Sequence, residues 1–332
     1  MKNVFLSVII TLVAALFPFN ADAQQWKDHW TDYHWTNGGE MLSSIRLNKT
    51  QVLLEGYGYM DAGYGYLFDI KSLGDTNYDM KGIPESAVKE RPNDLDEIAK
   101  MMLDGENCNG DDGAVWKRRN VNGHDLIISY FDDNTINSIY VPTGREMGEV
   151  VSDDMQEIIS GTYTSTQGKK FQFKTDGTCI FNGVPDTYCM SAEGEYGTPS
   201  LHIATKDKIW ELVPTTDGMK IYEAYHRPDA EGPFRGKLYA TLKASKSTPR
   251  WSFLSDRICT QYALGTLDGD VLRIMRNEIY ARQGYRFSDK KLQAYFDSCK
   301  WYKPIPDNSK VNLTGIETLN VSLIKQEEKY KQ

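Results

Sequence analysis

The clearest set of side chains that could do chemistry lies in a polar run near the C-terminus: Arg276, Asn277, Glu278, Tyr280 and Arg282. Guanidinium groups present rigid forks of donors that match carboxylates and phosphates. The two arginines can therefore form an anion or glycan site if they converge. The alternative is an arginine and glutamate network that holds helices together, because charged pairs beside an aromatic core usually serve structure. The sequence favours the structural alternative and leaves the binding site open.

A second candidate binding feature is a pair of Gly-Tyr-Gly-Tyr segments that contains Tyr57, Tyr59, Tyr64 and Tyr66. Alternation places every second residue of a strand on one face, and the glycines allow another group to approach the backbone closely. Exposed aromatic rings of this kind suit sugar rings or a protein partner. Cross-strand aromatic pairs also stabilise hairpins, and this structural alternative is favoured.

Metal sites and common catalytic motifs have little support. The oxygen-rich loop at 104–113 lacks the ligand spacing and closing glutamate of a calcium-binding hand, and the five histidines show no zinc spacing. We find no nucleophile-elbow serine, phosphate loop or dinucleotide fingerprint, and expect no cofactor and no metal. Catalytic residues can still converge only in space. A hydrolase that uses carboxylates such as Asp176, Glu193 or Glu195 in a cleft therefore stays open.

The N-terminus indicates export. Lys2 precedes an apolar run at 4–19, and Ala21-Asp22-Ala23 supplies small residues where a signal peptidase cuts, so residues 1–23 are a predicted signal peptide. The alternative is a membrane anchor, but the run is shorter than the roughly 20 residues of a spanning helix and contains Pro18. We expect the mature chain to be periplasmic or extracellular and not inserted in the membrane. A formal net charge of -8 argues against a nucleic-acid partner.

Five cysteines matter in an exported chain, because oxidising compartments favour disulfides. We predict two local pairs. Cys179 and Cys189 flank a turn-like segment, and Cys259 and Cys299 bracket the arginine-rich helix. Cys108 then remains unpaired, and no histidine near it in the sequence can activate its thiol.

Three helices are expected to position the C-terminal polar residues. Asp268 can cap the first helix, which Gly284 ends. Ser288 can cap the second helix, and Thr314 with Glu317 forms a capping box at the start of the third. Inward-facing tyrosine, phenylalanine and tryptophan side chains would give these short helices an aromatic core.

This C-terminal region resembles the YARHG domain, which is appended to exported bacterial proteins. The resemblance covers about residues 265–328 and rests on the run Leu272 to Phe287 and on Tyr295-Phe296 and Trp301-Tyr302. Where the family motif has histidine, this chain has Gln283. Histidine suits proton transfer near neutral pH and glutamine does not titrate, so a catalytic role for that position is not expected here.

The rest of the chain alternates like short strands. We predict an α+β fold in which one or two β-rich, barrel- or sandwich-like modules precede a small three-helix domain. The boundaries are 24–150 for an N-terminal β-rich α+β domain, 151–247 for a small antiparallel β domain and 251–332 for the YARHG-like domain.

Two functional hypotheses follow. The first is a non-catalytic exported protein that binds or scaffolds an unknown envelope component, either a glycan or a protein. The second is an envelope hydrolase with a carboxylate-based site in a cleft of a β domain. The sequence favours the first.

Overall fold

The computed structural model describes residues 28–32, 42–47, 51–57, 63–72, 77–82, 115–130, 135–142, 147–191, 200–206, 208–227 and 233–331. The chain divides into two compact units, one of residues 1–32, 40–119 and 125–144 and the other of residues 33–39, 120–124 and 145–332. The predicted signal peptide, the loop at 104–113 and Cys108 lie outside the described residues.

Strands β1 to β8 pair in the order of the sequence, and β1 also pairs with β8, so this sheet closes on itself. The predicted tyrosine hairpin is confirmed in the backbone, because β3 pairs antiparallel with β4. The strands are β1 (Asp28–Asp32), β2 (Leu42–Leu47), β3 (Gln51–Tyr57), β4 (Gly63–Ser72), β5 (Asn77–Gly82), β6 (Val115–Val121), β7 (His124–Tyr130) and β8 (Ile136–Val141).

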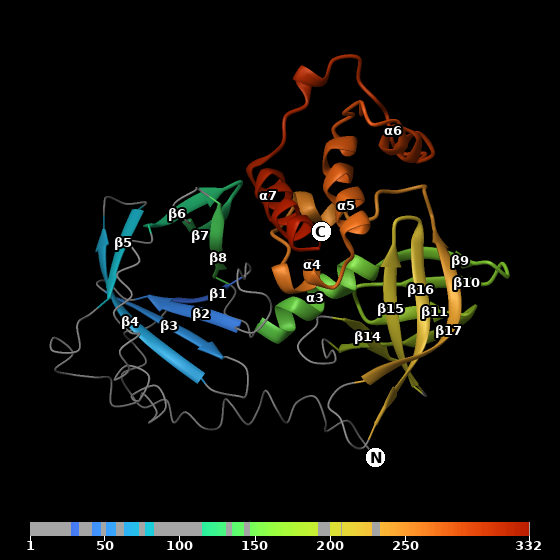
Figure 1. Ribbon diagram of the computed structural model, residues 1–332, viewed down its shortest axis with the longest axis horizontal. Helices are drawn as coiled ribbons and strands as arrows, with labels where there is room; N and C mark the ends of the chain where they lie inside the picture. The colour runs from blue at the N-terminus through green and yellow to red at the C-terminus, as the bar shows by residue number, and fades with distance from the viewer. Residues whose placement is uncertain are drawn as a thin grey trace. The chain divides into compact units, whose positions relative to one another are not determined.

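Helix α3 (Met147–Ile159) leads into a second sheet (Figure 1). Its nine strands pair in the order β12-β11-β10-β9-β17-β16-β15-β14-β13. The predicted antiparallel strands at 151–247 are therefore present. They are β9 (Gly161–Ser165), β10 (Lys170–Phe173), β11 (Thr178–Phe181), β12 (Val184–Thr187), β13 (Cys189–Ser191), β14 (Leu201–Ala204), β15 (Ile209–Thr215), β16 (Gly218–His226) and β17 (Pro233–Ala244).

Two Asn-Gly turns have the geometry that their residues predict. Asn122 and Gly123 between β6 and β7 have φ of 52° and 89°, and Asn182 and Gly183 between β11 and β12 have φ of 53° and 87°. Positive φ at both central residues defines the tight hairpin turn that matches strand twist, and asparagine and glycine tolerate it best. These turns fix the register of the strands that they join.

The second sheet is strongly curled. Phe181 on β11 and Trp210 on β15 have ring centroids 4.9 Å apart, although four strands separate β11 from β15 in the sheet order. In a flat sheet five strand spacings would separate them by roughly 24 Å. Their contact therefore requires the sheet to fold around its inner face. Large side chains on that face are buried, among them Phe171, Phe173 and Ile221.

The C-terminal region is helical, with η4 (Ser252–Ser255), α4 (Gln261–Gly265), α5 (Gly269–Arg282), α6 (Lys290–Asp297), η5 (Asn308–Lys310) and α7 (Gly315–Tyr330). The predicted Asp268 cap and the capping box of Thr314 and Glu317 are confirmed. Helix α6 begins one residue later than predicted, because Asp289 accepts hydrogen bonds from the backbone of Lys291 and Leu292. The short helix α4, capped by Thr260, was not predicted.

Gly284 follows α5 with φ of 82°, as the predicted helix end requires. A Cβ atom at this position would lie 2.8 Å from the carbonyl oxygen of Lys303, so both the dihedral and the available space favour glycine. The chain can therefore reverse direction after α5 and bring the α6 helix back against it.

An aromatic cluster centred on Phe296 fills the space between α5, α6 and the following loop. Phe296 is fully buried, and its ring lies 5.0 Å from Phe287 in a stacked arrangement and 5.0 Å from Tyr295 edge to face. Trp301 and Tyr302 complete the cluster at centroid distances of 6.0 and 5.9 Å. The predicted aromatic core is therefore present, and its rings adopt the offset and edge contacts that aromatic pairs prefer.

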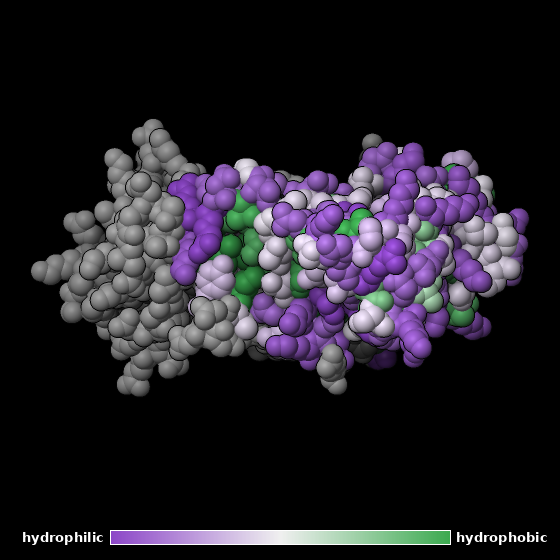
Figure 2. Space-filling model, turned by 90° about the horizontal axis from the view of Figure 1, so that it is seen from above, coloured by the Kyte–Doolittle hydropathy of each residue, from purple (hydrophilic) through white to green (hydrophobic). Residues whose placement is uncertain are grey.

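Polar side chains predominate on the coloured part of the face shown in Figure 2, with hydrophobic side chains grouped in smaller areas between them. Such a mixture is typical of a protein surface in contact with water. Across the described residues, helices that combine the length and the apolar character needed to cross a bilayer are absent.

The predicted disulfide between Cys179 and Cys189 is wrong. The Asn182-Gly183 turn pairs Phe181 with Val184, and the same register pairs Cys179 with Asp186. Cys189 lies three residues beyond that partner and belongs to β13, which pairs with β14. Both thiols are free in the structure. The sequence indicates the hairpin, but the prediction placed the cysteines without applying the register that a two-residue turn imposes.

The predicted disulfide between Cys259 and Cys299 is also wrong, since both of these buried cysteines are free. The backbone N–H of Cys259 donates to Asn320 Oδ1 of α7 at 3.0 Å. The Cys299 thiol, just beyond the end of α6, instead donates to the carbonyl oxygen of Tyr295, at 3.6 Å. The two cysteines therefore have separate structural environments.

Candidate functional site

Glu278 connects α5 to the segment that enters the helical region. Its carboxylate accepts hydrogen bonds from the backbone N–H groups of Arg250 at 3.1 Å and Trp251 at 2.7 Å. The side chain is buried, and burial raises its pKa while the two N–H donors act in the opposite direction. The role of Glu278 is thus to satisfy two backbone donors that would otherwise lack an acceptor.

Arg250 in turn holds this segment against the sheet. Its guanidinium donates to the carbonyl oxygens of Thr215, Thr216 and Gly218 at 2.9 to 3.1 Å and lies over the Trp251 ring. Trp251 is fully buried and donates through Nε1 to the carbonyl oxygen of Ile158 at the end of α3. The polar face of α5 is therefore connected to both the sheet and α3.

The other polar residues predicted on α5 have separate partners. Arg276 forms two hydrogen bonds with the Glu328 carboxylate of α7, at 2.6 and 3.0 Å. Asn277 donates to the carbonyl oxygen of Arg273 one turn earlier, at 2.7 Å. The Tyr280 ring packs against Tyr285, with centroids 5.7 Å apart. The bidentate pair of Arg276 and Glu328 holds α5 against α7 (Figure 1).

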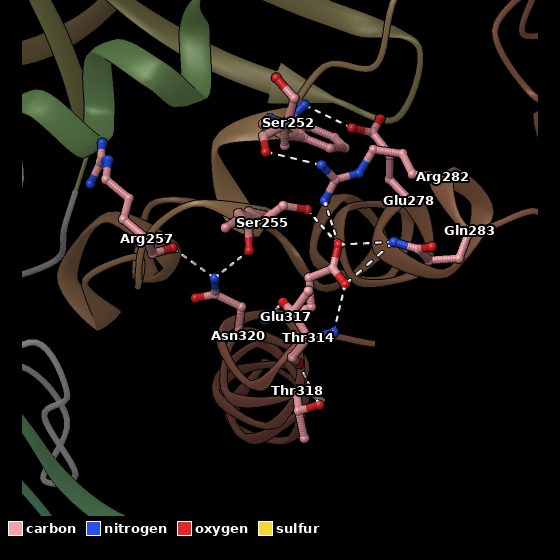
Figure 3. Close-up of polar contacts among 12 residues, drawn as sticks. Ser252, Ser255, Arg257, Glu278, Arg282, Gln283, Thr314, Glu317, Thr318 and Asn320 are labelled. Atoms are coloured by element: carbon pink, nitrogen blue, oxygen red, sulfur yellow. Dashed lines mark hydrogen bonds and ion pairs between the residues drawn. The ribbon is translucent and has the colours of Figure 1, made fainter. Parts of the chain in front are cut away.

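The end of α5 meets a buried carboxylate, Glu317, in the first turn of α7 (Figure 3). The side-chain amide of Gln283 donates to both Glu317 oxygens, at 3.4 and 3.5 Å. Ser255 donates a short hydrogen bond to the same carboxylate, and the backbone N–H of Thr314 donates at 3.0 Å. Arg282 lies 4.0 Å from Glu317 and donates to the carbonyl oxygen of Ser252.

One helical turn further along α7, the fully buried Asn320 adds three hydrogen bonds. Its side-chain amide donates to the carbonyl oxygens of Leu254 and Arg257, and its oxygen accepts the Cys259 N–H. Arg257 pairs with the fully buried Asp154 of α3, which also accepts from the Thr260 N–H at 2.6 Å. Glu317, Asn320 and Asp154 thus organise the segment 250–260 from two helices.

The tyrosine segments lie on paired strands, but none of the described tyrosines is the direct partner of another. Tyr57 pairs with Gly63, Tyr64 with Gly56, and Tyr66 with Leu54. Tyr59 lies outside the described residues. The register therefore places glycine or leucine opposite each described tyrosine, and the proposed binding role of this array stays a prediction.

An open cleft of about 730 Å³ lies on the second sheet, across β14 to β17. We call it the sheet cleft. The residues of its lining that bear on recognition are Thr205, Lys208, Glu223, Tyr225, Gly236 and Lys237. Lys208, which directly precedes β15, forms an ion pair at 3.0 Å with Glu223 of β16, and both side chains are substantially exposed.

Aromatic rings adjoin the sheet cleft. Trp210 donates through Nε1 to Thr205 Oγ1 at 3.1 Å, and the Lys208 ammonium lies 5.4 Å from the Trp210 ring. Tyr239 packs on Trp210 at 4.6 Å and stacks on Phe181 at 5.8 Å. Tyr239 remains 42% exposed and Tyr225 50% exposed. Aromatic surface of this extent in contact with solvent marks a candidate interaction site.

A second open cleft, of about 540 Å³, lies between β9, β10 and the segment 244–250. Hydroxyl side chains dominate its lining, together with Lys174 and Glu157. Burial raises the pKa of Glu157, and the nearby Arg257 lowers it. Among the described lining residues, this cleft has one carboxylate, Glu157, and the sheet cleft has one, Glu223. Glycoside hydrolysis generally uses a pair of carboxylates.

Asp176, one of the carboxylates considered for hydrolysis, is a turn residue. Its carboxylate accepts from the hydroxyl and the backbone N–H of Thr178, at 2.6 and 2.9 Å, and these bonds lower its pKa. A carboxylate that is ionised at neutral pH cannot act as a general acid there. Glu193 and Glu195 lie outside the described residues.

Comparison with protein families matches residues 249–329 to the YARHG domain. This part of the chain is a YARHG domain. The predicted resemblance to the YARHG domain is therefore confirmed. The match begins earlier than the predicted start near 265 and includes Arg250 and Trp251, whose backbone N–H groups donate to Glu278. No curated protein and no solved structure gives a significant match. YARHG domains are typical of exported proteins.

Within the YARHG domain, Glu317, Asn320 and Ser255 are the important polar residues that the sequence reasoning did not select as a site. Glu317 carried a signal, because the capping box marks it, but a capping box predicts the start of a helix and not an acceptor for a neighbouring helix. Asn320 and Ser255 carried none. Hydrogen bonds between residues more than 60 positions apart follow from packing and not from local spacing.

Proposed function

We propose that the protein is an exported binding or scaffolding protein that recognises a component of the cell envelope, either a glycan or a protein. The proposal includes a periplasmic or extracellular location and three parts, a β-rich part at 24–150, a β part at 151–247 and a YARHG domain from 251. The observation that carries it is the YARHG domain at 249–329, a type of domain typical of exported proteins.

The chemistry of the described residues supports binding more than catalysis. In the YARHG domain the charged groups of Arg276, Glu278 and Arg282 make hydrogen bonds to other parts of the protein. These groups therefore position the helices. The thiol of Cys259 is unsuited to nucleophilic attack, because burial raises its pKa well above the ordinary value. A binding function requires neither an activated nucleophile nor a carboxylate pair.

The proposal is tested by co-sedimentation of the mature protein, residues 24–332, with isolated cell-wall sacculi. We expect retention in the pellet. Sacculi treated with protease separate the two partner classes, since retention on treated sacculi indicates a glycan and loss of retention indicates an attached protein. Absence of retention on untreated sacculi would contradict the proposal for the cell wall.

Two arginine variants test whether the YARHG domain provides the contact. Arg276→Ala removes the bidentate pair with Glu328, and Arg273→Ala removes a more exposed pair with Asp289 on the same helix. If the arginine face binds the wall, Arg276→Ala lowers retention while circular dichroism shows the parent fold, and Arg273→Ala serves as the matched control. Equal retention of both variants and the parent would assign the contact to another part of the chain.

A further inference from the structure

The sheet cleft has the composition of a carbohydrate site. We infer that it binds an oligosaccharide that carries carboxylate groups. This inference rests on the proposed envelope-binding function and gives that function a specific location and ligand class. It is drawn from three observations on β14 to β17, namely the exposed aromatic rings, the charges at the cleft and the irregular pairing of β17.

The first observation is exposed aromatic surface at the cleft. Tyr225 lines the cleft, whereas Tyr239 packs on Trp210, which donates a hydrogen bond to the lining residue Thr205. A sugar ring offers C–H groups on its faces and hydroxyl groups around its edge. Flat aromatic side chains can cover the C–H groups, while neighbouring polar groups form hydrogen bonds with the hydroxyl groups. Buried hydroxyl groups require such partners. Thr205, Lys208 and Glu223 provide such donors and acceptors at the cleft.

The second observation is the charge at the cleft. Lys208 is paired with Glu223, whereas Lys237 is exposed and, within the described part of the chain, forms no ion pair. Among the described residues of its lining, the cleft thus carries two lysines and one carboxylate, on a chain whose formal net charge is -8. An unpaired ammonium group beside aromatic rings favours a ligand with carboxylates over a neutral sugar.

The third observation is the pairing of β17 with β16, which shifts register twice. Ile221 pairs with Ala240 and Tyr222 with Leu238, so Tyr239 is an extra residue, and a second extra residue follows between Leu238 and Arg235. Bulges of this kind redirect side chains and are common beside functional sites. The second shift falls at Gly236 and Lys237, which line the cleft, and the first falls at Tyr239, which packs on Trp210 beside it.

Gly236 permits the second shift. A Cβ atom at this position would lie 2.9 Å from the carbonyl oxygen of Glu223, too close for any other residue without movement of β16. The close approach of the two backbones holds Glu223 and Lys237 at the same end of the cleft. A protein partner would instead need a broad surface of about 800 Å² on each side, which a local cleft with charged walls does not offer.

The inference is tested by isothermal titration calorimetry of the mature protein with tetragalacturonic acid, which is acidic, and maltotetraose, which is neutral. We expect binding of the acidic tetrasaccharide, weaker binding at high salt, and at least about tenfold weaker binding of the neutral one. Tyr225→Ala and Lys237→Glu should each weaken acidic binding by about tenfold or more.

Two matched variants control for general effects. Tyr330→Ala removes an aromatic ring that is 61% exposed on α7, and Lys220→Glu reverses an exposed charge on β16 outside the cleft. Both should change affinity by less than about twofold. Thermal denaturation of every variant establishes that it folds.

No binding of the acidic tetrasaccharide, equal affinity for the neutral one, or unchanged affinity of both cleft variants would overturn the inference. Sedimentation with sacculi separates this failure from failure of the proposed function. If Tyr225→Ala and Lys237→Glu are retained on sacculi as strongly as the parent, the envelope function stands and the sheet cleft is not its site.

Discussion

The sheet of β9 to β17 and the YARHG domain use their aromatic and charged residues in opposite ways. In the YARHG domain the central ring, Phe296, is fully buried, and Arg276 and Glu328 are paired across two helices. In the sheet, Tyr225 and Tyr239 remain about half exposed, and Lys237 lies in the lining of an open cleft. The part of the chain with the recognisable motif is therefore the part whose motif residues mainly stabilise the fold.

A sequence motif can therefore identify a domain without locating a binding site. Motif residues such as Arg276 and Glu278 are close together in the sequence because they lie on one helix. Each of them pairs with a fixed neighbour elsewhere in the fold. The residues of the sheet cleft come from four strands, and two of them reach it through register shifts in β17. Experiments that remove one residue from each region test how far this contrast holds.

The largest effect is expected from Phe296→Ala. Truncating a buried phenylalanine in an aromatic cluster removes its contacts and leaves a cavity, which costs about 3–5 kcal/mol of unfolding free energy. Denaturant unfolding of parent and variant measures the change. Tyr330→Ala, at a ring that is 61% exposed, is the control and should change stability by less than about 0.5 kcal/mol. Similar losses for both would show that the Phe296 cluster is not the core of the domain.

Glu278→Ala should give the next largest loss. The backbone N–H groups of Arg250 and Trp251 lose their acceptor, and each buried unsatisfied donor costs about 1–3 kcal/mol. We therefore expect a loss of at least about 2 kcal/mol in unfolding free energy by the same measurement. Glu278→Gln keeps one carbonyl oxygen as acceptor and should lose clearly less. Equal stability of Glu278→Ala and the parent would instead leave Glu278 available for a ligand.

The two variants also bear on what the sequence could predict. Caps, turns and helix ends were predictable, because Asp268, Gly284 and the Asn182-Gly183 turn act through local geometry. The partners of Glu278 and Gln283 were not, since Arg250 and Glu317 lie far away in the sequence. The disulfide prediction was wrong for a related reason, as it used proximity in sequence where strand register decides.

The sheet cleft was missed for the same reason. Trp210 and Tyr239 carried no sequence signal as a pair, and their contact arises only because the sheet curls and β17 is irregular. Sequence patterns of period two indicate strands but do not show which strands meet across a curled sheet. A binding site on such a sheet becomes visible only when the pairing and its irregularities are known.

A smaller effect of pH is expected from Asp289 at the start of α6. The Leu292 N–H and the Arg273 guanidinium, together with the Lys291 N–H, lower its pKa below 3.8. Since the folded-state pKa lies below the unfolded-state value, the ionised carboxylate stabilises the fold above about pH 4, and this contribution disappears as pH falls through the lowered pKa. Asp289→Asn should lower Tm at neutral pH, and its Tm should converge with that of the parent as the pH falls through the lowered pKa. A Tm difference that is constant across this range would contradict the assignment.

The last prediction concerns the reactivity of the cysteines and involves no change in stability. Cys179, Cys259 and Cys299 are buried free thiols, whereas Cys189 is exposed. Alkylation of the native protein without reductant should therefore label Cys189 rapidly and the three buried cysteines only after unfolding, as peptide mass mapping would show. Because Cys179 and Cys259 lie in different parts of the unit that contains the sheet and the YARHG domain, their protection reports on the two regions separately. A peptide that joins Cys179 to Cys189, or Cys259 to Cys299, would contradict the strand register and helix contacts described above.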